Sequence, residues 1–306
     1  MPGLELAVSI LNRALSAGTP LLLGTLGEIY TERAGIINLG IEGMMSVGAV
    51  SGFWMAARTG SPWMGLLAAL LAGALLALLH AISTVWLRSN QIVSGLALTM
   101  LGLGFSGLFG KTLIGTTLTS RFQSIKLPLL SEIPLLGGSL FSQDPVFYLS
   151  LLIWLLVFLH YRHTRQGLRL KAIGDNPLAA ETMCVPVNCY KLLAVVFGGA
   201  MAGLAGGYLS LVYIPAWIEG MTGGRGFIVI ALTISSAWNP ARAAPMAYLF
   251  SAVYVLQYSF LQNYLSPHFL LMLPYLATLA ILTGSGKSGR FSAPVTLGMP
   301  YYRNSK

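Results

Sequence analysis

Long apolar stretches separated by short polar links limit the fold of this chain more than any motif does. A helix needs about 20 apolar residues to cross the roughly 30 Å of hydrocarbon in a bilayer. The stretches that approach this length are Leu4–Leu26, Ile36–Ala57, Trp63–Leu87, Ile92–Ile114, Val146–Tyr161, Leu192–Tyr213, Phe227–Ala237, Arg242–Leu261 and Phe269–Leu282. Only 9% of the 306 residues are charged, whereas soluble domains carry about a quarter. We therefore predict an all-α, polytopic membrane helical bundle with about nine transmembrane segments (roughly 8–10).

The seventh stretch, Phe227–Ala237, is too short to span a bilayer alone at about 1.5 Å of rise per residue. We expect it either to begin within the glycines at Gly223–Gly226 or to enter the membrane as a half-helix. Cytoplasmic loops of membrane proteins are enriched in Lys and Arg. If the segments alternate and the charged loop at residues 162–191 is inside, most of the 18 Lys and Arg residues fall inside. This distribution predicts an external N-terminus and a cytoplasmic C-terminus.

The polar segments indicate one transmembrane domain, residues 1–306, without a separate soluble unit. Residues 115–145 contain several prolines and glycines but few charges, which favours an ordered external loop. Residues 162–191 form the one long charged segment between apolar stretches, and we expect the protein to exchange with the cytoplasm through it. The N-terminus shows no basic region and no small-residue cleavage signal, so we expect the first stretch to be retained.

Composition and motifs argue against enzymatic and nucleic-acid functions. The net charge of +9 is spread between apolar stretches without a basic, aromatic-containing stripe, so we expect no nucleic-acid partner. Gly284–Gly289 contains GKS but lacks the preceding glycine and strand of a phosphate-binding loop. His and acidic residues show no ligand spacing, and Cys184 and Cys189 form no disulfide framework. We predict no catalytic residue, no metal site and no cofactor on this chain.

Three glycines of the sixth apolar stretch, Gly199, Gly203 and Gly207, are spaced four residues apart. Residues at this spacing share one face of a helix, and small residues let two membrane helices approach closely. We predict that this face contacts another helix, with a moving transport interface as the alternative.

Polar residues inside apolar stretches are the candidates for a translocation pathway. Asn38 and Glu42 are four residues apart, and we expect them to share a helical face. A carboxylate at mid-membrane costs roughly 2.5–3.5 kcal/mol, so Glu42 should face protein or a water-filled path. Two interpretations of Glu42 stay open: a hydrogen bond to a neighbouring helix end, or direct contact with the solute. No second ionisable residue accompanies it in that stretch, which leaves a proton relay unsupported.

A second interrupted segment, Glu219–Gly226, precedes the short seventh stretch. Its glycines permit unwound backbone, and the following helix would present its positive N-terminal end to polar or anionic groups. On this interpretation Thr222 and Arg225 face the outer part of the pathway. The alternative is a tight external turn in which Arg225 pairs with Glu219.

Several runs of residues together resemble a known family. They are Glu32–Met45 (ERAGIINLGIEGMM), Asn90–Gly95 (NQIVSG), Gly174–Ala180 (GDNPLAA), Gly220–Phe227 (GMTGGRGF) and Trp238–Pro240 (WNP). Nearly the whole chain resembles the permease subunits of ABC importers in the branched-chain amino acid, ribose and simple-sugar group. Within this group the chain is most similar to nucleoside-type permeases that work with a basic-membrane-protein-like lipoprotein receptor.

The resemblance implies a short cytoplasmic coupling helix that inserts into a cleft of a partner ATPase. The matching residues are Gly174, Asp175, Asn176, Pro177, Ala179, Ala180 and Glu181. Residue chemistry agrees, since Asp175 or Asn176 can cap a helix and Pro177 suits its first turn. We expect this helix at about residues 177–182. Cys184 departs from the family pattern, in which a glycine is usual, and this leaves the exit of the helix open.

The resemblance further implies the transmembrane permease subunit of an ATP-driven ABC importer for a nucleoside or a simple-sugar-like solute. Its implied partners are an ATPase subunit that binds ATP and Mg, a second permease chain in a heterodimer or a homodimer, and an external solute-binding protein or lipoprotein. The implied location is the bacterial inner membrane, with multiple crossings. We expect the translocation pathway at Asn38, Glu42, Asn90, Gln91, Met221, Thr222 and Arg225. The alternative is a self-contained secondary transporter or channel that uses Glu42 for ion coupling.

Overall fold

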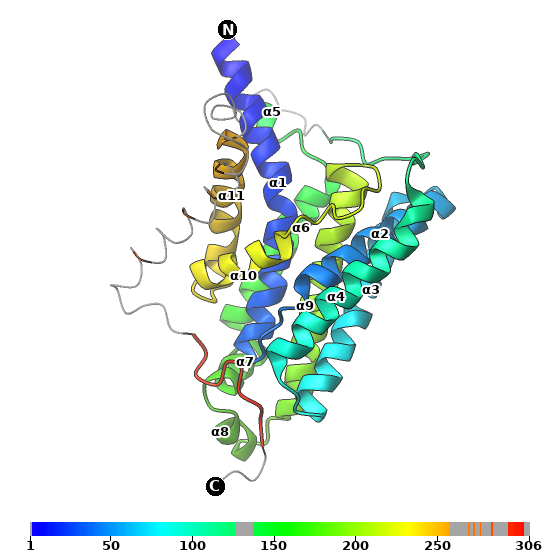
Figure 1. Ribbon diagram of the computed structural model, residues 1–306. Coiled ribbons are helices and arrows are strands. Elements are labelled where there is room, and N and C mark those ends of the chain that lie inside the picture. Colours follow the sequence, from blue (N-terminus) through cyan, green and yellow to red (C-terminus); the bar gives the residue numbers. More distant parts are fainter. Residues whose placement is uncertain are drawn as a thin grey trace.

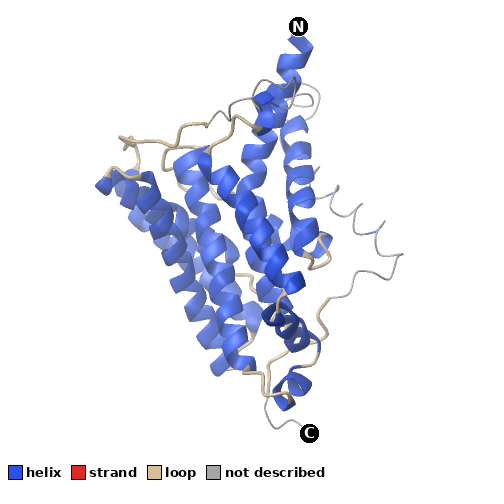
Figure 2. Cartoon of the chain, turned by 180° about the vertical axis from the view of Figure 1, so that it is seen from behind, coloured by secondary structure: helices blue, strands red, loops and turns tan. Residues whose placement is uncertain are grey.

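The computed structural model describes residues 2–125, 137–257, 269, 272, 276, 283 and 293–302. Every regular element among them is a helix, as expected for an all-α fold (Figures 1 and 2). The α-helices are α1 (Pro2–Arg33), α2 (Ile41–Thr59), α3 (Pro62–Ala81), α4 (Gln91–Gly110), α5 (Gly137–Leu140), α6 (Pro145–His163), α7 (Arg165–Asp175), α8 (Pro177–Thr182), α9 (Val187–Tyr208), α10 (Arg225–Ser235) and α11 (Pro240–Leu256). Short π or 3-10 turns extend three of them, namely η1 (Ile82–Trp86), η2 (Lys111–Leu113) and η3 (Leu209–Tyr213).

Helix lengths support several membrane crossings. In the described ranges, 4 helices are long and apolar enough to cross a membrane: Pro62–Trp86, Gln91–Leu113, Pro145–His163 and Val187–Tyr213. The seventh predicted stretch corresponds to α10, which begins at Arg225 inside the glycines and has 11 residues, about 16 Å at 1.5 Å per residue. The ninth, Phe269–Leu282, lies almost wholly outside the described residues, as does Gly284–Gly289. The expected total of about nine segments is therefore not confirmed.

Helix α9 is the central element of the bundle and packs against α1, α2 and α3. Its glycine face meets α3, as predicted. A Cβ atom on Gly203 would lie 2.2 Å from the backbone oxygen of Ala69, and one on Gly199 would lie 2.1 Å from the Cβ atom of Ala77. Because the two backbones are in direct contact, side chains larger than hydrogen do not fit along this face.

The first helix ends later than the apolar pattern predicts, because Gly35 and not the end of the apolar run terminates it. Gly35 has a φ of +83°, in the left-handed region that favours glycine. Its amide donates to the carbonyl of Glu32 at 2.9 Å, and the amide of Ile36 donates to the carbonyl of Thr31 at 3.2 Å. This pair of bonds is a Schellman motif, which closes α1 at Arg33.

Residues 34–40 form a non-helical break between α1 and α2. Asn38 lies in this break, whereas Glu42 lies in the first turn of α2. The expectation that these two residues share one helical face is therefore wrong.

The two ends of the bundle carry different segments. The N-terminal part of α1 and α5 lie at one end, and α7 and α8 lie at the other (Figure 1). Residues 116–125 of the predicted external loop run across the end with α5, while residues 126–136 of that loop are outside the described residues. Following the expected orientation, we call the end with α5 the outer end and the end with α8 the cytoplasmic end.

Candidate functional site

The cytoplasmic end contains two consecutive helices, α7 and α8, which meet at Asn176. The backbone of Asn176 is extended, and its side-chain Oδ1 accepts a hydrogen bond from the amide of Ala179 at 3.0 Å. Pro177 occupies the first turn, where its missing amide hydrogen would have no helical partner. The predicted helix at residues 177–182 is confirmed, with Asn176 and not Asp175 as its cap. Helix α7 was not predicted.

Helix α8 ends in a second Schellman motif, with Cys184 at the left-handed position. Cys184 has a φ of +58°. Its amide donates to the carbonyl of Glu181 at 2.8 Å, and the amide of Val185 donates to the carbonyl of Ala180 at 3.1 Å. Ala180 and Val185 also pack together in a small buried cluster, the apolar contact that accompanies this motif. A glycine is favoured at such a position, so Cys184 keeps the exit geometry at a conformational cost.

Burial divides the expected coupling residues into two groups. The exposed predicted residues are Asp175, Asn176 and Ala179, and beside them Leu178 and Met183, which were not predicted, are exposed as well. Gly174, Pro177 and Ala180 are buried, and Glu181 is half-buried. Gly174 is buried because α7 touches the end of α1: a Cβ atom there would lie 2.2 Å from the backbone oxygen of Arg33. The buried group fixes α8 to the bundle, and the exposed group is accessible to a partner.

Residues 293–302, which we call the C-terminal strap, lie against α7 and the break after α1. The amide and the hydroxyl of Thr296 both donate to the carbonyl of Gly174, at 3.0 and 2.7 Å. The amide of Gly298 donates to the carbonyl of Gly35 at 3.2 Å. The strap therefore connects the end of α7 to the break at residues 34–40. Sequence reasoning treated it as a polar tail.

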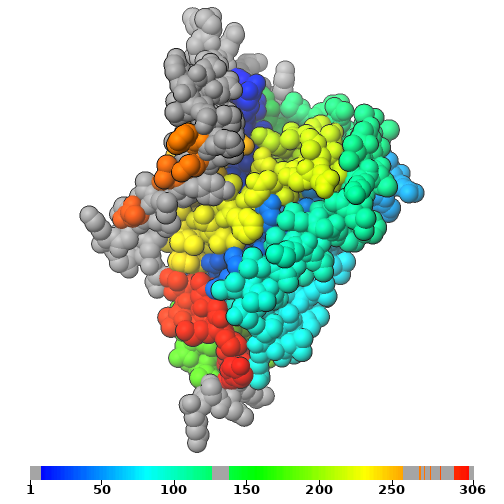
Figure 3. All heavy atoms as spheres, viewed as in Figure 1, coloured from blue at the N-terminus to red at the C-terminus, as the bar shows by residue number. Residues whose placement is uncertain are grey.

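The end of the strap is fixed by two tyrosines. The hydroxyl of Tyr301 donates to the carboxylate of Glu181, and the ammonium group of Lys191 lies 5.7 Å from the Tyr301 ring centre. The guanidinium group of Arg88 lies 4.7 Å from the ring centre of Tyr302. Figure 3 shows the strap, in red, covering this end of the molecule between α8 and the turn that joins α3 and α4. Movement of α8 would therefore displace the strap, which also contacts Arg88 and Lys191.

Positive charge gathers where α7 crosses α1 and α6. The ammonium group of Lys171 lies 4.1 Å from the ring centre of Tyr161. Burial, together with the nearby guanidinium groups of Arg33 and Arg162, lowers the pKa of Lys171. This charge distribution agrees with the expected cytoplasmic position of the helix.

Glu42 is buried at the start of α2 and contacts the first turn of α10. Its Oε1 accepts a hydrogen bond from the amide of Gly224 at 2.9 Å, and its Oε2 accepts one from the amide of Gly226 at 2.6 Å. The carboxylate thus neutralises the positive end of the half-helix and satisfies two amides that would otherwise be unpaired in the bundle. Of the two interpretations of Glu42, the structure shows the hydrogen bond to a neighbouring helix end. The N-terminal end of α10 is therefore already bound to an anionic group of this chain. A pathway role for Glu42 stays a prediction.

The side chains of the segment before α10 are less exposed than we expect for residues that face a solute pathway. Thr222 and Met221 are buried. The guanidinium group of Arg225 donates to the carbonyls of Met221 at 2.9 Å and Thr222 at 3.3 Å, and it lies 5.6 Å from the ring centre of Tyr213. The carboxylate of Glu219 instead lies beside Gly107 of α4. Arg225 therefore stabilises its own turn through backbone acceptors.

The other predicted pathway residues stabilise the break. Asn38 Oδ1 accepts a hydrogen bond from the amide of Gly40 at 3.0 Å, and Gln91 Oε1 accepts one from the amide of Ile37 at 2.8 Å. Asn90 is exposed and caps α4, and its Oδ1 accepts hydrogen bonds from two amides of the first turn at 3.0 and 3.2 Å. These contacts assign them positions in the fold, and their contact with solute stays a prediction.

Two carboxylates that sequence reasoning missed lie below this break. Glu28 and Glu32 are buried, one turn apart on α1. The indole nitrogen of Trp238 donates to Glu32, and the amide of Asn38 donates to Glu28 Oε2 at 3.5 Å. No donor from the described part of the chain reaches Glu28 Oε1. Their four-residue spacing within an otherwise apolar helix was the available signal.

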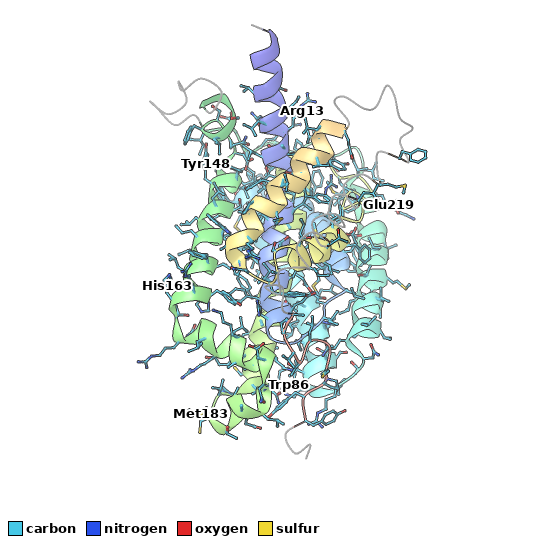
Figure 4. All side chains as sticks on the ribbon, turned by 90° about the vertical axis from the view of Figure 1, so that its left-hand side faces the viewer. Arg13, Trp86, Tyr148, His163, Met183 and Glu219 are labelled. Atoms are coloured by element: carbon cyan, nitrogen blue, oxygen red, sulfur yellow. The ribbon has the colours of Figure 1, made fainter. Side chains whose placement is uncertain are left out.

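A cavity of about 930 Å³, which we call the outer cavity, opens at the outer end. Its lining residues come from five parts of the chain: Asn12, Arg13, Ser16, Phe122, Ser124, Ser142, Gln143, Asp144, Tyr208, Val212, Tyr213, Tyr254 and Val255. Figure 4 shows Arg13 at this end of the molecule and Met183 at the opposite end. No predicted pathway residue lines the outer cavity, although the position of the charged Arg13 within the first apolar stretch was an available signal.

Hydrogen bonds organise the floor of the outer cavity. The hydroxyl of Tyr208 donates to Asp144 Oδ2 at 2.9 Å, and the amide of Phe147 donates to Asp144 Oδ1 at 2.8 Å. The side-chain amide of Gln143 donates to Asn12 Oδ1 at 3.1 Å. The carboxylate of Asp144 thus caps α6 and also accepts a hydrogen bond from Tyr208 of the central helix α9.

Comparison with known proteins identifies consistent relatives. The family described as branched-chain amino acid transport system / permease component matches residues 10–282. A putative glucose ABC transporter permease protein of Haloferax volcanii is 36% identical over 98% of this chain and 99% of its own length. A guanosine ABC transporter permease protein of Bacillus subtilis is 33% identical, covering 97% of both chains. A nucleoside ABC transporter permease protein of Lactococcus lactis subsp. cremoris is 31% identical over 96% of this chain and 97% of its own. No solved structure shows significant similarity.

Proposed function

This chain belongs to the permease components of branched-chain amino acid transport systems, and from that membership we propose that it forms the solute pathway of an ATP-driven importer. The solute is a nucleoside or a simple-sugar-like molecule, in keeping with the names of the relatives. The chain itself carries out no covalent chemistry. Hydrolysis of ATP with Mg takes place on a partner ATPase, and an external binding protein or lipoprotein delivers the solute. A second permease chain, different or identical, completes the transporter in the bacterial inner membrane.

The observation that carries this proposal is the construction of α8. It is a single short helix, capped at both ends and exposed on the face of Leu178 and Ala179. It is tied to the strap through Glu181, and the preceding helix α7 touches the end of α1 at Gly174. When ATP closes the ATPase pair, a force on α8 reaches the break at residues 34–40 through these contacts. That break adjoins Glu42 and α10, so the coupling segment and the half-helix are mechanically linked.

The proposed docking face is tested by substituting an exposed residue of α8. Ala179→Trp adds bulk where a partner must approach, without disturbing a buried contact of this chain. We expect it to reduce solute-stimulated ATP hydrolysis of the reconstituted transporter at least tenfold. The matched control is Asn188→Trp, at an exposed position of the same end outside α8, which should leave hydrolysis unchanged. Normal stimulation with Ala179→Trp would remove the docking assignment.

A second experiment distinguishes the ATP-driven importer from the alternative, a self-contained carrier that is coupled to an ion through Glu42. Both carboxylate oxygens of Glu42 accept backbone hydrogen bonds, an arrangement that suits a structural role. We expect vesicles that contain this chain alone to show no uptake driven by a proton or sodium gradient. Glu42→Gln should lower uptake by the full transporter to the same extent at every pH. Gradient-driven uptake by the chain alone would overturn the proposed function.

A further inference from the structure

The outer cavity has the size of a solute site. Its volume of about 930 Å³ lies within the roughly 300–1,000 Å³ typical of small-molecule sites. It is bounded by α1, the beginning of α6, the end of α9 with η3, and α11. It also reaches residues of the external loop, so it is placed where a solute delivered from outside would enter.

Arg13 is the cationic group of this cavity. It lies in the first apolar stretch, where a charged side chain is retained only if it faces protein or a water-filled space. Within the described ranges, no carboxylate or carbonyl accepts a hydrogen bond from its guanidinium group. The carboxylate of Asp144, which also lines the cavity, accepts hydrogen bonds from Tyr208 and Phe147. The guanidinium group lines the cavity, where its paired donors can meet a ligand.

Other polar groups of the cavity lining are held by hydrogen bonds. The hydroxyl of Ser16 donates to Gln143 Oε1 at 3.3 Å, and Gln143 Nε2 donates to Asn12 Oδ1 at 3.1 Å and to the carbonyl of Ser139 at 2.6 Å. Gln143 is buried, with 2% of its surface exposed. Groups fixed in this way bind a ligand without a further ordering cost.

Aromatic rings supply the remaining surface. Phe122, Tyr213 and Tyr254 line the cavity, and their faces suit a planar ring. The Phe122 ring is fixed by an edge-to-face contact with Trp63, with ring centres 5.0 Å apart. The guanidinium group of Arg225 lies 5.6 Å from the ring centre of Tyr213.

We propose that the outer cavity binds a purine nucleoside that carries a 6-oxo group, such as guanosine or inosine, and that Arg13 recognises its acceptor edge. A guanidinium group presents paired donors in a fixed fork, which matches the adjacent O6 and N7 acceptors of a 6-oxopurine. The base stacks on aromatic rings, and the ribose hydroxyls bond to the polar groups of the cavity lining. Adenine places a donor at position 6 and a hexose has no planar face, so both fit less well. This inference rests on the proposed transport function, whose solute it names.

Equilibrium binding to the assembled transporter, reconstituted in lipid without its external binding protein, tests the assignment. Radiolabelled guanosine, inosine, adenosine and glucose are the probes. We expect the first two to bind at least tenfold more tightly than the others. Arg13→Met should remove this preference, and Arg13→Lys should lose most of it because an ammonium group cannot form the paired contact. The matched control, Arg58→Met, changes an exposed arginine that stacks on Trp54 away from the cavity and should bind as the wild type does.

Two results would overturn the inference: unchanged guanosine affinity in Arg13→Met, or a wild-type preference for adenosine or glucose. Ser124→Trp, at the exposed rim of the cavity, provides a second variant that does not depend on Arg13. It should block guanosine binding, and full binding by this variant would also refute the site. ATP-driven uptake of glucose or adenosine alone would contradict the cavity assignment and leave the proposed function standing. Absence of ATP-driven uptake of every solute would contradict the proposed function itself.

Discussion

The cytoplasmic end and the outer end of this bundle use their polar groups in opposite ways. At the cytoplasmic end, the strap bonds to the backbone carbonyls of Gly174 and Gly35, and the cavity between the strap and α8 is small, about 250 Å³. At the outer end, Gln143 and Asp144 are held by their neighbours around an open cavity. The first arrangement stiffens a connection between distant segments, whereas the second keeps a shaped space ready for a ligand. On this difference rests our proposal that force is transmitted at the cytoplasmic end and that solute is recognised at the outer end.

The largest expected effect that separates the two ends is that of Gly174→Leu. The new side chain would begin 2.2 Å from the backbone oxygen of Arg33, so α7 must move away from α1. We expect a loss of about 1–3 kcal/mol in the free energy of unfolding and the loss of ATP-driven uptake, with solute binding at the outer end retained. The control is Ala172→Leu, at an exposed position of the same helix. Normal uptake by Gly174→Leu would show that this contact transmits nothing.

The next effect belongs to the outer end. Tyr208→Phe removes the hydroxyl that donates to Asp144, and hydrogen bonds to charged groups contribute about 1.5–3 kcal/mol. We expect solute affinity to fall about tenfold or more, while the number of ATP molecules hydrolysed per solute transported stays unchanged. Tyr213→Phe, which alters another ring of the cavity, should have a smaller effect. A change in the ATP requirement would break the proposed division between the two ends.

A smaller effect is expected from Tyr301→Phe in the strap. The substitution removes the hydrogen bond to Glu181, worth about 1.5 kcal/mol or less at this half-buried position. Solute binding should be unchanged, and more ATP should be hydrolysed per solute because α8 is held less firmly. Tyr190→Phe is the control, since its hydroxyl accepts a hydrogen bond from the guanidinium group of Arg169 at 3.3 Å, on the exposed side of α7. Uncoupling of equal size in both variants would argue against a special role of the strap.

The smallest effect is a gain in stability at the cytoplasmic end. A residue with a side chain in the left-handed region costs roughly 1–2 kcal/mol, so Cys184→Gly should stabilise the protein by about 1 kcal/mol. Cys189→Gly, in the first turn of α9, should instead destabilise it by up to about 1 kcal/mol because glycine is a poor helix former. Thermal unfolding in detergent measures both shifts. A lower melting temperature for Cys184→Gly would contradict the Schellman geometry.

Features that depend on neighbouring residues in the chain were predicted well. The helix at residues 177–182 follows from Asn176 and Pro177, and the close contact of α9 follows from the spacing of Gly199, Gly203 and Gly207. The break after α1 was misread because an apolar run was taken for a continuous helix. Gly35 was the signal for it, since a glycine that ends a helix marks the left-handed position of a Schellman motif.

The sequence by itself determined the membrane class, most of the long helices, the short helix that begins within the glycines before residue 227, and the capped helix at residues 177–182, because hydrophobic length, capping and glycine spacing are local properties. Only the tertiary structure decided that Glu42 meets amides more than 180 residues away, that Thr296 bonds to Gly174, and that Arg13 faces a cavity. Such contacts depend on how the helices are arranged in space. Each of these side chains could equally have been satisfied by another neighbour in a different arrangement of the same helices.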